Sequence, residues 1–283
     1  MSATAIVHGY GLTGSGSNIY VNKLSESLCA EGEDVHIVCQ ERDLQAVPPH
    51  VTVIYDYDEH GKVCRRQELG PSPKKGQAVL HRPHLGPVLP VYYWDSYPGF
   101  DRVATFLDLT DEELENYLTY HARAVRTLID DFGVRVLHAN HVLAMPQVCL
   151  RAAEGTMARV LMTPHGSAIE YVAKKQPRYF TMALEALRAV DGVVVGGSEM
   201  LDRIDAVWGQ HLEGRSKADT IPTGVDLTVF RPAESIQPDA LAGAEQGCSR
   251  ACMDALYEEA SVAQTNEELM AAGEKARSAY VHK

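Results

Sequence analysis

The stretch ATAIVHGYGLTGSGS, Ala3–Ser17, joins a short apolar run to a glycine-rich segment. The run Ala3–Val7 carries no charge, which is typical of a buried strand, and the glycines after it predict a loop whose backbone a ligand can approach. A helix is predicted from Asn18 to Ala30, with its apolar residues on one face and Gly32 as its stop. A strand, a glycine loop and a helix in this order are typical of a parallel sheet covered by helices.

The same alternation continues along the chain. Short Val-rich runs bounded by glycine, proline or polar residues predict strands, and amphipathic segments between them predict helices. The predicted strands with their turns are residues 34–40, 50–56, 135–140, 158–166, 191–198 and 218–222. The predicted helices are residues 110–132, 143–153, 169–189 and 199–208, the first of them starting with a capping box of Thr110 and Glu113. Residues 59–108 show no clear period. We predict an α/β fold with a doubly wound, mostly parallel, Rossmann-like sheet.

Sheets of this kind bind ligands outside the carboxyl ends of their strands. Three glycines, Gly9, Gly11 and Gly14, have the G-x-G-x-x-G spacing of a dinucleotide-binding loop, and Glu41, after the second strand, is a candidate partner for a ribose. Residues 15–17 lengthen this loop, which predicts a helix that starts after them and favours a wider cleft that closes on another ligand. Both interpretations remain open at this point.

Three histidines, His138, His141 and His165, stand at the ends of predicted strands and should meet at one edge of the sheet. A neutral imidazole can bond a hydroxyl or a phosphate oxygen. His165 is the strongest candidate for substrate contact, because Gly166 after it lets a ligand come near. Ser198 is expected to cap the helix that follows it or to contact substrate. No carboxylate or cysteine stands at a spacing that would complete a metal site, so none is predicted.

The composition excludes several classes of function. The formal net charge is -12 and the sequence pI is ≈ 5.4, which argues against a nucleic-acid ligand. No stretch reaches the roughly 18 apolar residues of a membrane span, and Met1–Gly9 lacks the basic and apolar segments of a secretion signal. The six cysteines are scattered. We therefore expect a cytoplasmic protein with free thiols, no nucleic-acid partner and no integral membrane span.

The chain resembles the N-terminal half of the family 4 (group 1) retaining glycosyltransferases, which have the GT-B fold of two facing Rossmann-like domains. The resemblance lies in five segments: GLTGSGSNIYVNKLSESLCAEGEDVHIVC (11–39), VLHANH (136–141), TPHGS (163–167), DGVVVGGSEM (191–200) and IPTGVDLTVFRP (221–232). The last segment is the most specific, because the family links its two halves with a similar sequence. Thr223 stands in it where the family usually has asparagine.

The resemblance implies transfer of a sugar from a nucleotide-diphospho-sugar to a carbohydrate or other acceptor, with retention of configuration and usually without a metal ion or other cofactor. It places Gly14, Ser15 and Gly16 in the loop that closes on the donor phosphates, and His165, the candidate catalytic residue, where a histidine commonly contacts the sugar. The candidate substrate-binding residues are His138, His141, Ser198, Thr223 and Gly224.

The resemblance covers Ala3–Pro232, so residues 1–232 are expected to form the Rossmann-like acceptor-side domain. Residues 233–283 are rich in alanine and glutamate, show no second Rossmann pattern and are predicted to form a helical linker or tail. In the family, the second domain holds most of the nucleotide and neutralises its diphosphate. We therefore expect one half of an enzyme, with the donor domain missing or carried by a second chain, which transfers little sugar alone.

Residues 59–100 combine cations with aromatic rings, which suits an anionic or sugar-bearing acceptor, because arginine pairs with phosphate and rings stack on sugar faces. A solvated loop whose rings fill the core is an equal alternative. The candidate acceptor-binding residues are Arg65, Arg66, Tyr93 and Trp94. Two other functions stay open beside the transferase: a non-catalytic binding module or subunit of a split glycosyltransferase, and an NAD-dependent Rossmann enzyme.

Overall fold

The computed structural model describes residues 3–95, 97, 99–212 and 218–224 of the 283-residue chain. The chain divides into two compact units, Met1–Tyr93 with Tyr97–Pro222, and Trp94–Ser96 with Thr223–Lys283. All the described helices and strands belong to the first unit. The predicted boundary at Pro232 and the predicted helical segment 233–283 lie outside the described residues.

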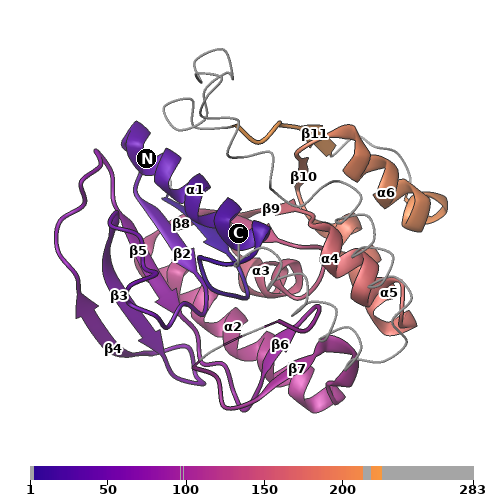
Figure 1. Ribbon diagram of the computed structural model, residues 1–283, viewed down its shortest axis with the longest axis horizontal. Helices are drawn as coiled ribbons and strands as arrows, with labels where there is room; N and C mark the ends of the chain where they lie inside the picture. Colours follow the sequence, from indigo (N-terminus) through magenta and orange to yellow (C-terminus); the bar gives the residue numbers. More distant parts are fainter. Residues whose placement is uncertain (1–2, 96, 98, 213–217, 225–283) are drawn as a thin grey trace, which may run out of the picture. The chain divides into compact units, whose positions relative to one another are not determined.

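A nine-stranded sheet forms the framework of the first unit (Figure 1). Its strands are β1 (Ala3–Val7), β2 (Val35–Val38), β3 (Val51–Tyr57), β4 (Val63–Glu68), β5 (Ala78–Arg82), β8 (Val134–Asn140), β9 (Arg159–Thr163), β10 (Gly192–Val195) and β11 (Ala218–Thr220). Their order in space is β11-β10-β9-β8-β1-β2-β5-β3-β4, and β4 alone runs antiparallel to its neighbour in this sheet. The predicted mostly parallel α/β sheet is confirmed.

The strand order reverses at β1, in the middle of the sheet. β1 pairs in parallel with β2 on one side and with β8 on the other. The chain leaves β1 for β2, continues through β3, β4 and β5 on that side, and later returns to β8 on the opposite side. The carboxyl ends of β1 and β8 therefore flank a topological switch point, where sheets of this type bind their ligands.

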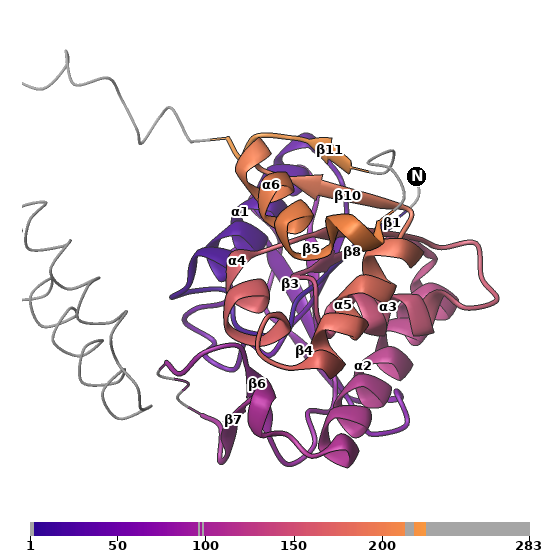
Figure 2. The same ribbon diagram turned by 90° about the vertical axis from the view of Figure 1, so that its right-hand side faces the viewer.

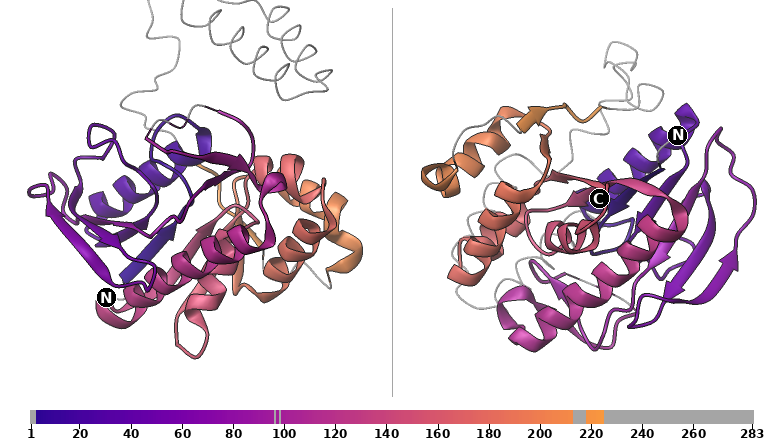
Figure 3. Two further views of the ribbon diagram at one scale, coloured as in Figure 1. Left: turned by 90° about the horizontal axis from the view of Figure 1, so that it is seen from below. Right: turned by 180° about the vertical axis from the view of Figure 1, so that it is seen from behind.

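Helices cover both faces of the sheet (Figures 2 and 3). They are α1 (Gly16–Glu31), α2 (Asp111–Phe132), α3 (Met145–Ala153), the single turn α4 (Gly166–Ala168), α5 (Pro177–Ala189) and α6 (Ser198–Trp208). Three shorter pieces are η1 (Phe106–Asp108), the π-helical turn η2 (Ile169–Ala173) and η3 (Gly209–His211). Among the described residues, none of these helices has the length and hydropathy needed to cross a bilayer.

Alternating side chains of the central strands feed two separate cores. On one face, Ile6 of β1 and Ile37 of β2 pack with Val21 and Cys29 of α1. On the other face, strand residues of β1, β8 and β9 pack with α2, α3 and α5. The contacting strand residues on this second face are Ala5, Val7, Leu137, Ala139, Val160 and Met162. Because a strand points successive side chains to opposite faces, the short apolar runs in the sequence fill both cores at once.

Local signals set the ends of the helices. The predicted capping box of α2 is present, since the Thr110 side chain accepts from the Glu113 amide and the Glu113 carboxylate accepts from the Thr110 amide. Gly133 ends α2 with φ 69, a left-handed conformation that glycine adopts without steric cost. The expectation that α1 begins after residue 17 is wrong, because Ser15 is its N-cap and Gly16 its first residue.

Residues 59–108, where the sequence showed no period, contain four strands. β4 and β5 belong to the main sheet, while β6 (Leu89–Val91) and β7 (Val103–Thr105) pair in parallel as a separate two-stranded sheet. All but one of the residues of β4 are exposed. A strand with no buried face carries no alternation of apolar and polar residues, which is why its sequence did not predict it.

Candidate functional site

The loop between β1 and α1 is held at the switch point by side chains on both sides of it. Oε2 of the buried Glu41, just after β2, accepts from the Leu12 amide at 2.8 Å. The Asn18 amide group donates to the Thr13 carbonyl at 2.5 Å, and its oxygen lies 2.8 Å from Nε2 of His8. The loop is thus tied to β1, β2 and α1, and Glu41, the predicted partner of a ribose, is engaged by the loop itself.

The three predicted phosphate-loop residues lie at the beginning of α1. Gly14 has φ 92, and a Cβ added to Gly14 or Gly16 would meet no atom within 4 Å. Ser15 caps the helix, its Oγ accepting from the Asn18 amide at 3.4 Å. The first amides of a helix lack partners within it and carry partial positive charge, so they suit an anion such as a diphosphate.

The structure brings the three predicted histidines together beside α1. The ring centroids of His141 and His165 are 4.7 Å apart. The ring centroid of Tyr20, in α1, lies 5.5 Å from that of His165 and 6.5 Å from that of His138, in edge-to-face contacts. Tyr20 therefore connects the first turns of the helix that follows the glycine loop to the histidine cluster.

His141 occupies a strained and unsatisfied position. It has φ 69, and Ala144, three residues later, has φ 65, although neither is glycine. His141 is 1% exposed, and neither of its ring nitrogens has a hydrogen-bond partner among the described residues. Left-handed conformations and orphaned buried polar atoms each cost free energy and gather at functional sites. The segment between β8 and α3 therefore holds a backbone conformation and a buried side chain that both cost folding free energy.

Sequence reasoning missed several members of this cluster. His8 stacks on His141 with ring centroids 5.6 Å apart, and the ring centroid of Tyr92 lies 4.4 Å from that of His141. Oδ1 of Asn140 is 3.1 Å from Nε2 of His165. No motif predicted these contacts, since they depend on how α1 and the segment after β6 fold over the strand ends. We call His8, His138, His141 and His165 the histidine cluster.

The histidine cluster is uncharged at neutral pH. Burial lowers the pKa of His8 and of His138 to about 4 and that of His165 to about 3, with His8 and His138 adding to the effect on His165. The pKa of His141 is well below its usual value for the same reason, helped by His165 and His8. A neutral imidazole has one donor and one acceptor nitrogen, so the cluster can recognise hydroxyl groups without attracting net charge.

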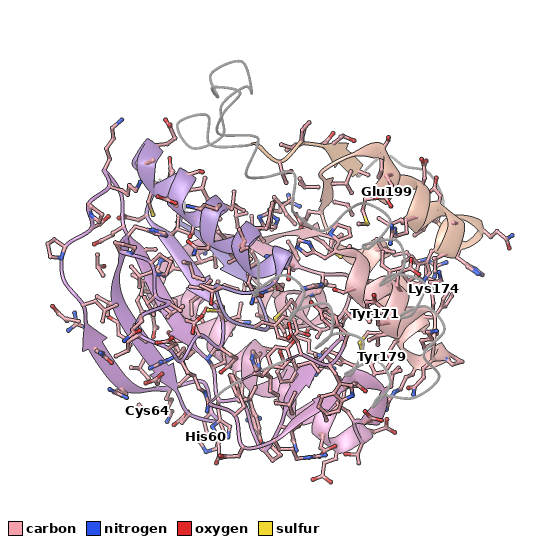
Figure 4. The ribbon with its side chains drawn as sticks, viewed as in Figure 1. His60, Cys64, Tyr171, Lys174, Tyr179 and Glu199 are labelled. Carbon is pink, nitrogen blue, oxygen red and sulfur yellow. The ribbon has the colours of Figure 1, made fainter. Side chains whose placement is uncertain are left out.

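Charged groups beside the His165 turn are paired with one another. Arg203 of α6 bonds Glu199, and its Nη1 lies 3.3 Å from Glu170 of η2. Lys174 also bonds Glu170, at 2.6 Å, and Figure 4 shows Lys174 and Glu199 on the same side of the molecule. A Cβ on Gly166 would lie 3.1 Å from Nη1 of Arg203. This ion-pair network packs on the turn and supports its position.

The other predicted site residues lie elsewhere or in the second unit. Ser198 is exposed and is the first residue of α6, where Gly197 takes the N-cap position, so the predicted Ser198 cap is wrong. Thr223, Gly224 and Trp94 belong to the second compact unit. The ring centroids of Tyr93 and of Tyr171 in η2 are 5.6 Å apart.

The two predicted acceptor arginines lie on the edge strand β4. Arg65 has its Nε 4.0 Å from Asp56, and Arg66 bonds Glu68 at 2.6 Å and Tyr55 at 3.2 Å. Figure 4 shows Cys64, the residue before them, on the opposite side of the view from Tyr171. Within the described residues, no group of three histidine, cysteine or acidic side chains could hold a metal ion.

Known proteins share this fold and part of this sequence. The family model of the glycosyl transferase 4-like domain matches residues 15–224. Sucrose-phosphate synthase from Thermosynechococcus elongatus is 19% identical over 88% of this chain and 54% of that chain, with a TM-score of 0.55. A glycosyltransferase from Rickettsia africae ESF-5 is 14% identical over 86% of this chain and 48% of that chain, with a TM-score of 0.45. No curated protein matches the sequence significantly.

The chain spans about half the length of these two solved chains, 54% of the sucrose-phosphate synthase and 48% of the Rickettsia glycosyltransferase. That likeness shows the fold, an α/β arrangement that corresponds to about half of a GT-B chain. The family match covers most of the described first unit, including Ser15 and Gly16 at the start of α1 and the histidines His138, His141 and His165. The chain therefore belongs to the glycosyl transferase 4-like domain family.

Proposed function

We propose that this chain supplies the acceptor-side lobe of a retaining glycosyltransferase that takes its sugar from a nucleotide-diphospho-sugar. The observation that carries the proposal is the contact of Tyr20 with His165, because it places an open helix N-terminus beside a cluster of neutral imidazoles. A nucleotide-diphospho-sugar needs both, since its phosphates are anionic and its sugar presents hydroxyl groups.

Each part of the site takes one role in this proposal. The amides of Gly14, Ser15 and Gly16 face donor phosphate oxygens. His165 contacts the transferred sugar, and His138 and His141 bond substrate hydroxyls. Ser198, Thr223 and Gly224 remain proposed substrate contacts, with Arg65, Arg66, Tyr93 and Trp94 as proposed acceptor contacts. The family resemblance implies that a second lobe holds the nucleotide, and this lobe or a second chain that carries it is the proposed partner.

The donor-binding part of the proposal is tested at Gly16. A side chain there meets open space, and an acidic residue in the first turn of a helix stabilises the helix. Gly16→Glu should therefore fold while its carboxylate repels a phosphate. In a titration of the full chain followed by the amide signals of the loop, Gly16→Glu should bind nucleotide-diphospho-sugars at least about tenfold more weakly, while the uncharged Gly16→Gln loses less.

The titration also separates the alternatives. A shift of the loop amides with NAD, but with no nucleotide-diphospho-sugar in the panel, would support the NAD-dependent enzyme and reject the transferase. The transfer step is tested separately, by incubating the chain with nucleotide sugars and acceptors. We expect little turnover by the chain alone and restored transfer with a partner that carries the second lobe. Rapid transfer by the purified chain would reject the assignment to one half of an enzyme.

A further inference from the structure

The side-chain amide of Asn18 fixes the protonation of His8. Nδ2 of Asn18 donates to the Thr13 carbonyl at 2.5 Å, and a carbonyl only accepts, so the amide oxygen must face His8. That oxygen is 2.8 Å from Nε2 of His8. An amide oxygen accepts only as well, so Nε2 of His8 carries the proton. Nδ1 of His8 is then an unprotonated acceptor, and it is buried without a partner among the described residues.

Asn140 fixes His165 by the same arrangement on a different strand. Its Nδ2 donates to the carbonyl of Val7 at 3.4 Å, which leaves its oxygen 3.1 Å from Nε2 of His165. Nε2 of His165 therefore donates, and Nδ1 is its bare nitrogen. Both asparagines are buried, at 7% and 0% exposure for Asn18 and Asn140, so water does not compete for these bonds.

We propose that Asn18 and Asn140 are positioning residues that set the tautomers of His8 and His165, so that the histidine cluster accepts hydrogen bonds from sugar hydroxyls and discriminates against phosphate. A hydroxyl donates its proton to a bare imidazole nitrogen. A phosphate oxygen is an acceptor with negative charge. It would face the lone pairs of the two bare imidazole nitrogens, which cannot donate to it. This inference rests on the proposed function, because it assigns the sugar and not the phosphates of the substrate to this cluster.

His141 completes the pattern between the two fixed histidines. It stacks on His8 and lies 4.7 Å from His165 by ring centroids, and both of its nitrogens are unpartnered within the described chain. A neutral His141 offers one donor and one acceptor, as a sugar hydroxyl does. Two fixed acceptors and one unfixed imidazole therefore match neighbouring hydroxyl groups of a sugar ring better than a single anion.

The experiment measures the tautomers directly. The full chain is labelled with ¹⁵N in its imidazole rings, and long-range ¹H–¹⁵N correlation spectra at pH 7.5 show which ring nitrogen carries the proton. The variants His8→Gln and His165→Gln identify the two signals. We expect the Nε2–H form for both residues. An Nδ1–H form, or a mixture of forms, at His165 would overturn the proposal.

Asparagine variants then test the cause. Asn140→Leu should lose the fixed tautomer at His165 and leave His8 unchanged, while Asn18→Leu should do the reverse. Asn22→Leu is the matched control, because Asn22 donates to the Leu12 carbonyl at 3.3 Å in the same loop and should leave both signals unchanged. If Asn140→Leu does not fold, Asn140→Asp serves, since its carboxylate should keep the Nε2–H form and raise the pKa of His165. An unchanged pKa in this variant would contradict the assignment.

A phosphate titration tests the discrimination. Inorganic phosphate added to the labelled protein should leave the His8 and His165 ring signals in place, and a shift of either one would reject this part of the proposal. None of these spectra requires turnover. An absence of sugar transfer in the presence of a partner that carries the second lobe would thus count against the proposed function alone, whereas a wrong tautomer would count against this inference alone.

Discussion

Oε2 of Glu41 accepts a hydrogen bond from the backbone amide of Leu12 at 2.8 Å, which joins the end of β2 to the loop after β1. Oε1 of the same carboxylate accepts from the Asp43 amide at 2.9 Å. A Cβ on Gly11 would lie 2.8 Å from Oε2, so the loop packs directly on this buried group. One carboxylate thus satisfies two backbone donors and fixes the position of the glycine loop beside the end of β2.

Replacing Glu41 with glutamine should destabilise the protein. The glutamine oxygen can replace one acceptor, but its amide group would face a backbone donor, and a buried unsatisfied donor costs about 1–3 kcal/mol. Urea unfolding of Glu41→Gln should show a loss of this size. Glu185→Gln on the exposed side of α5 is the control and should change the free energy of unfolding by less than about 0.5 kcal/mol. Equal stability of the two variants would mean that Glu41 does not hold the loop.

Two glycines of the same loop should respond to alanine with opposite signs. Gly14 has φ 92, so Gly14→Ala forces a side chain into the left-handed region and should cost about 1–2 kcal/mol, although the added Cβ meets no atom. Gly16 is the first residue of α1 and is not among the glycines with positive φ. Gly16→Ala should leave stability unchanged or raise it by up to about 1 kcal/mol. Thermal unfolding of both variants checks this contrast. A Gly14→Ala variant as stable as the unsubstituted protein would contradict the positive φ at Gly14.

The fold was predictable where the signals were local. The Val-rich runs and the Thr110–Glu113 capping box each act within a few residues, and each matched the observed element. The strand β4 was not predictable, because its sequence VCRRQE lies on an exposed edge and pairs only with β3. The start of α1 was misjudged by two residues, since Ser15 caps the helix although glycines stand on both sides of it.

The site was predictable in part for a related reason. His138 lies near the end of β8, and His141 and His165 follow β8 and β9. The carboxyl ends of these parallel strands share one edge of the sheet. His8 and Asn18 could not be paired from sequence, because their contact requires α1 to fold back over the end of β1. Glu41 was a candidate partner for a ribose. Its carboxylate instead accepts from the amide of Leu12, 29 residues away, and from that of Asp43, and these bonds have no signature in the sequence.

The buried histidines should make the protein sensitive to acid. Burial lowers the pKa of His8, His121 and His138 to about 4 in the folded state, against roughly 6.5 in an unfolded chain. Between these values the unfolded state binds protons that the folded state excludes, so stability is complete above about pH 6.5 and falls as the pH drops toward 4. Each such histidine contributes about 1.4 kcal/mol per pH unit in this window.

Urea unfolding at pH 7.5, 6.5, 5.5 and 5.0 tests this dependence. The free energy of unfolding should begin to fall between the first two values and should fall steeply below them. His121→Gln should reduce the slope and also lower stability at neutral pH, because His121 accepts from Gln40 and donates to the Tyr117 carbonyl. A free energy that does not change down to pH 5.0 would mean that these histidines are already protonated or exposed in the folded protein.

Two arginines that approach the same carboxylate should differ in their effect on stability. Arg82 bonds Asp56 through Nε at 2.6 Å and Nη2 at 3.1 Å, and its side chain is 13% exposed. Arg65 is 4.0 Å from the same carboxylate, and its side chain is 63% exposed. A partly buried bidentate pair loses both bonds and leaves its partner unsatisfied, so Arg82→Ala should cost about 2–3 kcal/mol, while Arg65→Ala should cost less than about 0.5 kcal/mol. Chemical unfolding of the two variants measures the difference.

Because Arg65→Ala is expected to be stable, a loss of binding to an anionic acceptor in that variant would report a direct contact, and unchanged binding would remove Arg65 from the acceptor site.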